Sequence, residues 1–219
     1  MYGYYSVVII SLMLGLLASA LVNSRMRKYS RIASSLGMTG EQIAYKMLSD
    51  NGVSDVRVLR GREGQDHFDP RSNTISLSPS NFNSTSLTAV ATACHESGHA
   101  LQYAKNYKPL FIRASLVPAV NFCSNAWIFV FLIGVFANIA GATMLACAIY
   151  AFVVLFQVIT LPVEFNASSR GLDYMRSLGL SSEEISASSK LLRACALTYV
   201  VAAVASAIQL LWIISSSER

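Results

Sequence analysis

The stretch ATMLACAIYAFVVLFQVITLP, residues 142–162, carries no formal charge and has about the 20-residue length that a helix needs to cross a bilayer. Three more stretches share this character: Tyr4–Val22, about Val117–Asn138, and Ala194–Ile214. The apolar fraction of the 219-residue chain is 53% and the charged fraction is 13%, values that exclude an ordinary soluble globule. The sequence therefore predicts a mainly α-helical, multi-pass membrane protein with four transmembrane helices.

The basic residues lie almost entirely on one side of this four-helix map. Twelve occur from Arg25 to Arg113, four from Arg170 to Arg193, and one at Arg219. The positive-inside rule assigns the basic side to the cytoplasm, so both termini are expected outside a plasma membrane. Topology and anionic lipid headgroups then account for the net charge of +5, and no nucleic-acid partner is expected.

The pentapeptide His95-Glu96-Ser97-Gly98-His99 lies between the first two spans. Residues four apart share one face of a helix, so both imidazoles can reach one metal ion while Glu96 serves as a candidate general base. Two solvent-facing histidines on a polar helix are the alternative. The helix is expected to run from near Ser84–Ser86 to about Tyr103, too short and too polar to span a bilayer. We therefore expect a zinc site at the cytoplasmic membrane surface.

The third metal ligand must come from elsewhere in the chain, because a catalytic zinc ion takes three protein ligands and keeps one position open. Glu164 follows the third span directly, where a carboxylate is costly unless it is paired or bound to a cation. A snorkelling carboxylate, or one paired with Arg170, is the alternative. The other acidic residues downstream are Asp173, Glu183, Glu184 and Glu218. We predict that His95, His99 and Glu164 bind one Zn²⁺ per chain.

The polar region before the motif predicts a small sheet and a short helix. Thr39-Gly40-Glu41-Gln42 has the form of a capping box, and Asn51-Gly52 ends the amphipathic helix that follows. Val56–Leu59 and Thr74–Ser78 are expected to be strands, with a turn at Asp69–Asn73 between them. The second strand is either an ordinary half-buried strand or, if its edge is free, a place where extended substrate pairs through its main chain.

Several blocks along the chain resemble the YugP-like membrane family of neutral zinc metallopeptidases. They are Asn51–Val56, Asp66–Pro70, His95–Gln102, Thr160–Ser168 and Leu197–Val200. The resemblance implies a zincin-like α+β unit, with a short sheet and the HExxH helix, and peptidase activity. The segment that starts at Glu164 also resembles the third-ligand segment of HtpX-like membrane peptidases. Such relatives have Asp four residues after the glutamate, where this chain has Ser168, which is expected to orient a histidine more weakly.

A few other residues are candidates for a role at the site. Arg170, Tyr103 and Tyr174 can each polarise a substrate carbonyl, and the sequence does not choose among them. His67 can be a fourth ligand or a hydrogen-bond donor to substrate, although a structural role in the turn is favoured. Gly98 is expected to let the motif helix pack closely on a neighbour, such as the helix with the third ligand.

These features divide the chain into five expected segments. They are a transmembrane anchor at 1–23, a cytoplasmic catalytic region at 24–113, a transmembrane hairpin at 114–163, a cytoplasmic helical segment at 164–193, and a last transmembrane helix with an external C-terminus at 194–219. Ala18-Ser19-Ala20 resembles a processing site, but no basic residue precedes it and four follow within residues 25–31, so a retained anchor is expected.

The predicted function is that of a zinc-dependent endopeptidase embedded in the membrane, with peptides or membrane proteins as substrates. A role in membrane-protein quality control rests on the HtpX-like resemblance, and homo-oligomers or partner membrane proteins are left open. One alternative is a non-enzymatic scaffold with a structural or vestigial zinc site, closed by His67 or Cys94. The other alternative is a zinc hydrolase that acts on lipid or on another non-peptide amide.

Overall fold

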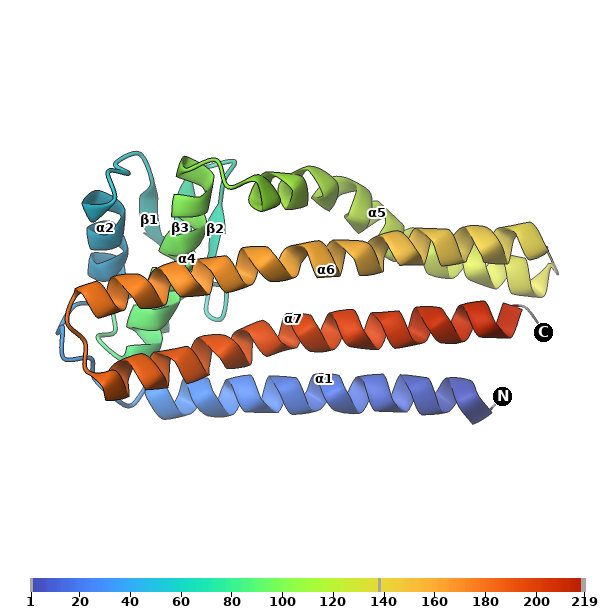
Figure 1. Ribbon diagram of the computed structural model, residues 1–219, viewed down its shortest axis with the longest axis horizontal. Coiled ribbons are helices and arrows are strands. Elements are labelled where there is room, and N and C mark those ends of the chain that lie inside the picture. The colour runs from blue at the N-terminus through green and yellow to red at the C-terminus, as the bar shows by residue number, and fades with distance from the viewer. Residues whose placement is uncertain (1, 138, 218–219) are drawn as a thin grey trace. The chain divides into compact units, whose positions relative to one another are not determined.

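A computed structural model describes residues 2–137 and 139–217 (Figure 1). Within these ranges the chain is mostly helical, with one small sheet, as the sequence predicts. In chain order the elements are α1 Tyr2–Tyr29, α2 Gly40–Asp50, β1 Arg57–Arg60, β2 His67–Asp69, β3 Thr74–Leu77, α3 Pro79–Phe82, α4 Leu87–Ala104, α5 Lys108–Phe136, α6 Ala140–Ser177 and α7 Ser182–Ser217.

The chain forms two compact units, and all four long helices, α1, α5, α6 and α7, contribute residues to both. The first unit comprises Met1–Ser19, Phe111–Pro162 and Leu197–Arg219. The second comprises Ala20–Leu110 and Val163–Ala196, and therefore holds α2, the sheet, α3, α4 and the C-terminal part of α6. The five-segment division expected from the sequence stays a prediction.

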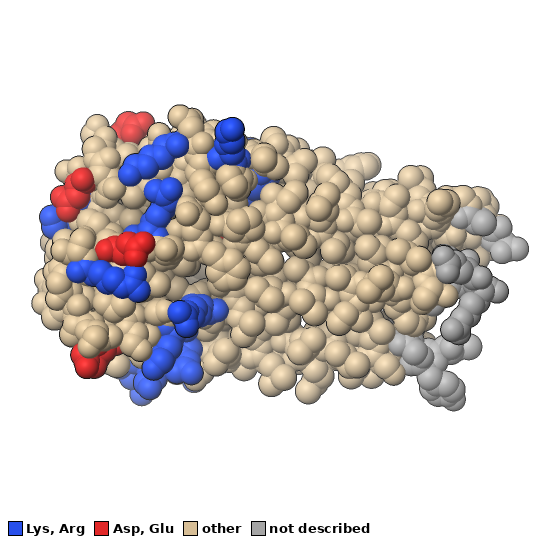
Figure 2. Space-filling model, in the orientation of Figure 1, with Lys and Arg blue, Asp and Glu red and all other residues tan. Residues whose placement is uncertain are grey.

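Four helices are long and apolar enough to cross a membrane, which confirms the predicted number of spans. They are Tyr5–Tyr29, Lys108–Phe136, Gly141–Ser177 and Ser182–Ser215. On the face shown in Figure 2, the charged side chains gather over one part of the molecule and the rest of the described surface carries none. Each helix continues past the apolar stretch that predicts it, so polar residues extend the same helix.

The first unit is held together by close helix contacts and a few polar bonds. A Cβ added at Gly134 on α5 would lie 2.7 Å from the backbone nitrogen of Thr143, so α5 and α6 approach closely beside their connection. Tyr150 on α6 donates a hydrogen bond to Gln209 Oε1 on α7 at 3.1 Å, and its ring lies 4.5 Å from that of Trp127. These contacts join α5, α6 and α7 within the first unit.

The helices of the second unit begin at the capping residues that the sequence indicates. Thr39 and Gln42 form a reciprocal capping box at the start of α2. Ser86 Oγ accepts a hydrogen bond from Ala89 N at 3.2 Å and so caps α4. At the start of α7, Ser181 and Glu184 bond each other in the same reciprocal way, at 3.2 and 3.0 Å.

The sheet differs from the prediction, because it has three strands in the order β1-β3-β2. β1 pairs with β3 in parallel, and β2 pairs with β3 antiparallel. β2 escapes prediction because it has only three residues, too few for an alternating pattern. As the central strand, β3 has no free edge, so the alternative in which Thr74–Ser78 pairs with substrate is excluded and the ordinary strand remains. Within the described residues the two edge strands are β1 and β2.

α6 positions the candidate ligand, because it runs without a break from the first unit into the second. Pro162 lies inside this helix rather than at its end. Glu164 therefore lies inside a continuous helix and not on a linker after its end. α4 crosses this part of α6 (Figure 1).

Candidate metal centre

Two helix faces with the same spacing meet at the candidate site. On α4 the face consists of His95, Gly98, His99 and Gln102, and on α6 it consists of Glu164, Ala167, Ser168 and Gly171. In each set the residues lie at positions i, i+3, i+4 and i+7, which share one side of a helix. Each face therefore brings its metal-binding and small residues to the other helix.

Glycines allow the two faces to approach closely. A Cβ at Gly98 would lie 2.5 Å from the backbone oxygen of Ala167, so no larger residue fits there without a shift of α6. A Cβ at Gly171 would lie 3.1 Å from the backbone of Cys94. The structure confirms that Gly98 packs on the helix with Glu164. Gly171 was missed, although its place seven residues after Glu164 is a usable signal.

The crossing brings three ligand-type side chains together. His95 Nε2 lies 3.4 Å from Glu164 Oε2, and His99 Nε2 lies 3.6 Å from the same oxygen. The ligand atoms of the three residues all lie within 4.8 Å of one another, and the Glu164 side chain is only 5% exposed. A buried carboxylate flanked by two imidazole nitrogens is the arrangement expected around a cation.

These separations fit a zinc ion. Zinc bonds of about 2.0–2.1 Å in a tetrahedron separate neighbouring ligand atoms by roughly 3.3–3.4 Å. The two distances from Glu164 are close to this value and longer than a good hydrogen bond. Two nitrogens and one oxygen are also the donor types of catalytic zinc sites. The residues present therefore fit the metal that the motif predicts.

The other ring nitrogen of each histidine has its own partner. Ser168 Oγ lies 3.1 Å from His95 Nδ1, the contact expected of that residue. Gln102 Oε1 lies 3.0 Å from His99 Nδ1, which the sequence did not suggest. Both contacts orient an imidazole so that Nε2 faces the cluster. Gln102 was detectable only as the residue seven positions after His95.

The charges around His99 act in opposite directions. Burial lowers the pKa of the His99 imidazole, while the neighbouring Glu164 and Glu96 carboxylates raise it, and the net pKa lies above its ordinary value. Glu96 directly follows His95 on α4, and its negative charge contributes to the raised pKa of His99. Glu96 is itself 7% exposed. A base is therefore present beside the ligands and shielded from bulk water.

Neither candidate for a fourth protein ligand joins the cluster. His67 lies exposed in β2, where it pairs with Ser76, and this strand directly precedes the turn at residues 70–73. Cys94 is fully buried, and burial raises the pKa of its thiol to about 12, which disfavours the thiolate that a metal needs. Among the described residues the group near Glu164 has three members, His95, His99 and Glu164.

The three candidates for polarising a substrate carbonyl lie in different surroundings. Tyr103 lies at the end of α4, with its ring 5.9 Å from that of Phe68 in β2. Tyr174 donates a 2.6 Å hydrogen bond to Asp50 on α2, which lowers the pKa of that carboxyl. Arg170 Nε donates to Asn166 Oδ1 at 2.8 Å. Arg170 therefore bonds within α6, and Glu164 faces the histidines.

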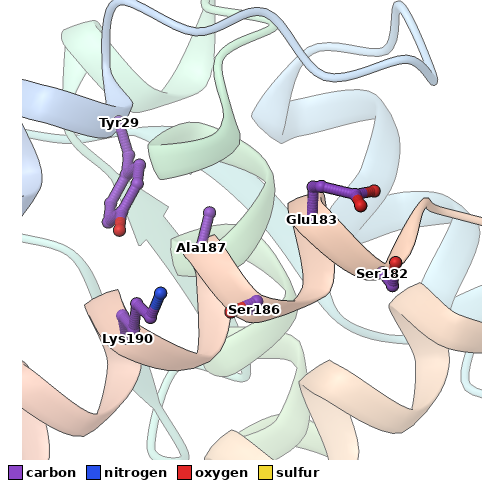
Figure 3. Close-up of a pocket in the computed structure, with 6 residues that line it drawn as sticks. All are labelled: Tyr29, Ser182, Glu183, Ser186, Ala187 and Lys190. Carbon is purple, nitrogen blue, oxygen red and sulfur yellow. The ribbon is translucent and has the colours of Figure 1, made fainter.

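The second unit also has a pocket away from this cluster. It has a volume of about 330 Å³ and is lined by Tyr29, Ser182, Glu183, Ser186, Ala187 and Lys190. Figure 3 shows Tyr29 extending from α1 toward the first turns of α7, which carry the other five residues. None of the candidate ligands lines it, so it is separate from the metal centre.

Comparison with known proteins agrees with the geometry. The family model described as "Putative neutral zinc metallopeptidase" matches residues 4–218. The chain is 40% identical over 193 residues to "Putative membrane protease YugP" of Bacillus subtilis (strain 168), which covers 87% of this chain and 85% of that protein. No solved structure matches the chain.

Proposed function

The chain belongs to the family described as "Putative neutral zinc metallopeptidase", and we propose that it is a zinc-dependent endopeptidase embedded in the membrane. The observation that carries the proposal is the cluster of His95, His99 and Glu164, with Glu96 beside it on α4. The three donors leave a fourth position around the metal for water or substrate, which is the property that separates catalytic from structural zinc sites.

Each residue of the cluster has a role in this proposal. His95, His99 and Glu164 would hold the metal, as in gluzincin-type HExxH peptidases. Zinc, when bound, supplies a Lewis acid that activates water and polarises the scissile carbonyl. Glu96 takes the proton from the attacking water and passes it to the leaving amine. Burial of Glu96 helps this transfer, because few bulk water molecules compete for the proton.

The edge of β2 offers a place for an extended substrate. β2 pairs with β3 on one side only, and Phe68 in this strand contacts Tyr103, which lies one turn after His99 on α4. A peptide added to this edge would be held by main-chain bonds, with little demand on its sequence. Main-chain binding in the middle of a chain suits an endopeptidase.

The proposed location of the enzyme rests on its membrane spans and on the basic residues between them. The basic residues predict an active site on the cytoplasmic side of the plasma membrane, with both termini outside. A site close to the bilayer surface favours membrane proteins or their cytoplasmic loops as substrates, in keeping with membrane-protein quality control. Reporter fusions to the C-terminus test the topology: activity of a cytoplasmic reporter there would reverse it.

Zinc content and peptide cleavage by the purified full chain test the proposal. We expect one zinc per chain, cleavage of internal bonds in unstructured peptides, and loss of that cleavage in Glu96→Gln with zinc retained. Glu63→Gln, at an exposed loop position, is the matched control and should stay active. An undiminished rate in Glu96→Gln would show that Glu96 is not the base and refute the mechanism.

A scaffold with a closed structural zinc site receives less support. It needs a fourth protein ligand, and His67 and Cys94 both lie outside the group of three. A hydrolase that acts on lipid would use the same residues, so tests with lipid amides and esters belong beside the peptide assay.

A further inference from the structure

Gln102 is a fully buried amide to which the proposed reaction assigns no role. Its side chain makes three polar contacts. Oε1 lies 3.0 Å from His99 Nδ1, while Nε2 donates to the backbone oxygen of Val163 at 2.8 Å and to Asn166 Oδ1 at 3.0 Å. Both hydrogens of the amide nitrogen are therefore used, and the amide oxygen faces the imidazole.

Arg170, at the end of this hydrogen-bond chain away from His99, determines which atoms donate and which accept. A guanidinium group has donors and no acceptor, and Arg170 Nε donates to Asn166 Oδ1 at 2.8 Å. This charge-assisted bond fixes which end of the Asn166 amide faces inward. Gln102 then meets two oxygens, the Asn166 Oδ1 and a main-chain carbonyl, so it must present its NH₂ group to them. A flipped Gln102 would place oxygen against oxygen.

We propose that Arg170, Asn166 and Gln102 form a positioning device that selects the tautomer of His99. Because Gln102 Oε1 can only accept a hydrogen bond, His99 Nδ1 must carry the hydrogen. A neutral imidazole carries a hydrogen on only one of its two nitrogens. Nε2 is then left with a free lone pair directed at the cluster, the form that binds a metal. Glu164 Oε2 lies 3.6 Å from His99 Nε2, whereas Gln102 Oε1 lies 3.0 Å from His99 Nδ1, which makes the contact with Gln102 the closer of the two.

The other histidine has no such device. The partner of His95 Nδ1 is the Ser168 hydroxyl, which can either donate or accept, so this contact fits both tautomers. The inference rests on the zinc-binding part of the proposed function, and it assigns to Arg170 a positioning role in place of direct contact with substrate.

Nitrogen NMR of the imidazoles tests the device without metal or substrate. The chain has three histidines, so His67→Gln and His95→Gln suffice to assign the signals of the ¹⁵N-histidine-labelled full chain in detergent micelles. At a pH where the imidazoles are neutral, we expect His99 to be protonated at Nδ1 in the wild type. In Gln102→Leu we expect a mixture of both tautomers.

Zinc affinity supplies the second measurement. Loss of a partner that orients a ligand weakens metal binding by about 10- to 100-fold, and we expect this for Gln102→Leu. Asn166 is only half-buried and tolerates change better, so a pair of variants there separates the device from folding. Asn166→Leu should weaken zinc binding in the same direction, while Asn166→Asp keeps both acceptor bonds and should bind as the wild type. Gln65→Leu, at an exposed position, is the matched glutamine control.

Wild-type His99 protonated at Nε2 would overturn the inference, as would an unchanged tautomer and zinc affinity in Gln102→Leu. If Gln102→Leu does not fold, equal zinc affinities of Asn166→Leu and Asn166→Asp would overturn it instead. A protein that shows the expected tautomer and zinc affinities but cleaves no peptide would refute the proposed function and leave this inference standing.

Discussion

The two ends of the contact between α4 and α6 support their histidines in different ways. At the His99 end, a buried amide uses all its bonding groups and links the imidazole to Asn166 and Arg170. At the His95 end, one serine hydroxyl makes a single contact. Two ligands of one helical motif therefore need not be held equally well, and the surrounding residues decide how firmly each is oriented.

Glu164 belongs to both ends, because its Oε2 lies near both histidines, and its loss should have the largest effect. Glu164→Gln keeps the shape of the side chain but removes the negative ligand. We expect zinc binding to weaken by more than about 100-fold and peptide cleavage to disappear, measured by metal content and peptide assay. Asp173→Asn, exposed on the same helix, is the control. Retained zinc in Glu164→Gln would mean that a different residue is the third ligand.

Alanine substitution of the two glycines, Gly98 and Gly171, should lower the free energy of unfolding by different amounts. Gly98→Ala places a Cβ 2.5 Å from a backbone oxygen, and relieving the contact should cost about 1–3 kcal/mol in the free energy of unfolding. At Gly171 the nearest backbone atoms are 3.1 Å away, and the better helix propensity of alanine, about 1 kcal/mol, offsets much of the strain. Denaturation of both variants in the same detergent checks this order. A larger loss for Gly171→Ala would contradict the packing described.

Ser168 tests the weaker end directly. Ser168→Ala removes the hydroxyl that contacts His95 Nδ1, and we expect zinc affinity to fall by about tenfold or less, a smaller effect than that of Gln102→Leu. Ser168→Asp would place a carboxylate there and should strengthen zinc binding. Calorimetric titration with zinc compares the variants, with Ser169→Ala on the exposed side of α6 as control. An effect of Ser168→Ala greater than that of Gln102→Leu would reverse the comparison.

A smaller, pH-dependent effect is expected beyond the His95 end, where Tyr174 joins α6 to α2. The hydrogen bond from Tyr174, followed by that from Lys46, lowers the pKa of Asp50 in the folded chain. A lowered folded pKa stabilises the fold above the unfolded pKa, and this stabilisation is lost as the pH falls through the folded value. Tyr174→Phe should therefore lower the Tm slightly at neutral pH and not at strongly acidic pH. An equal loss of Tm at neutral and at strongly acidic pH would show that Asp50 is not involved.

The sequence predicts most of the long helices and the cluster itself, because these follow from local patterns. Uncharged stretches indicate the spans, Thr39 and Ser86 indicate helix starts, and the cost of a carboxylate beside hydrocarbon singles out Glu164. The expectation for Ser168 came from a resemblance rather than from spacing.

The missed features depend on contacts between distant parts of the chain. β2 is stabilised by its pairing with β3 and has no pattern of its own. In the sequence, Gln102 is an ordinary polar residue on a helix. Its role depends on the packing of α6, which places Asn166 beside it. Both omissions bear on the proposed function, since one changes where we propose that substrate binds and the other changes how His99 is held.

X-ray absorption at the zinc edge of the purified, zinc-loaded full chain identifies which atoms bind the metal. We expect one zinc with two imidazoles and one carboxylate from the protein, further coordination by light atoms only, and bonds of about 2.0–2.1 Å. A sulfur ligand at about 2.3 Å would implicate a cysteine, and a third imidazole would implicate His67. Either result would show a closed site of another composition and contradict the catalytic centre described.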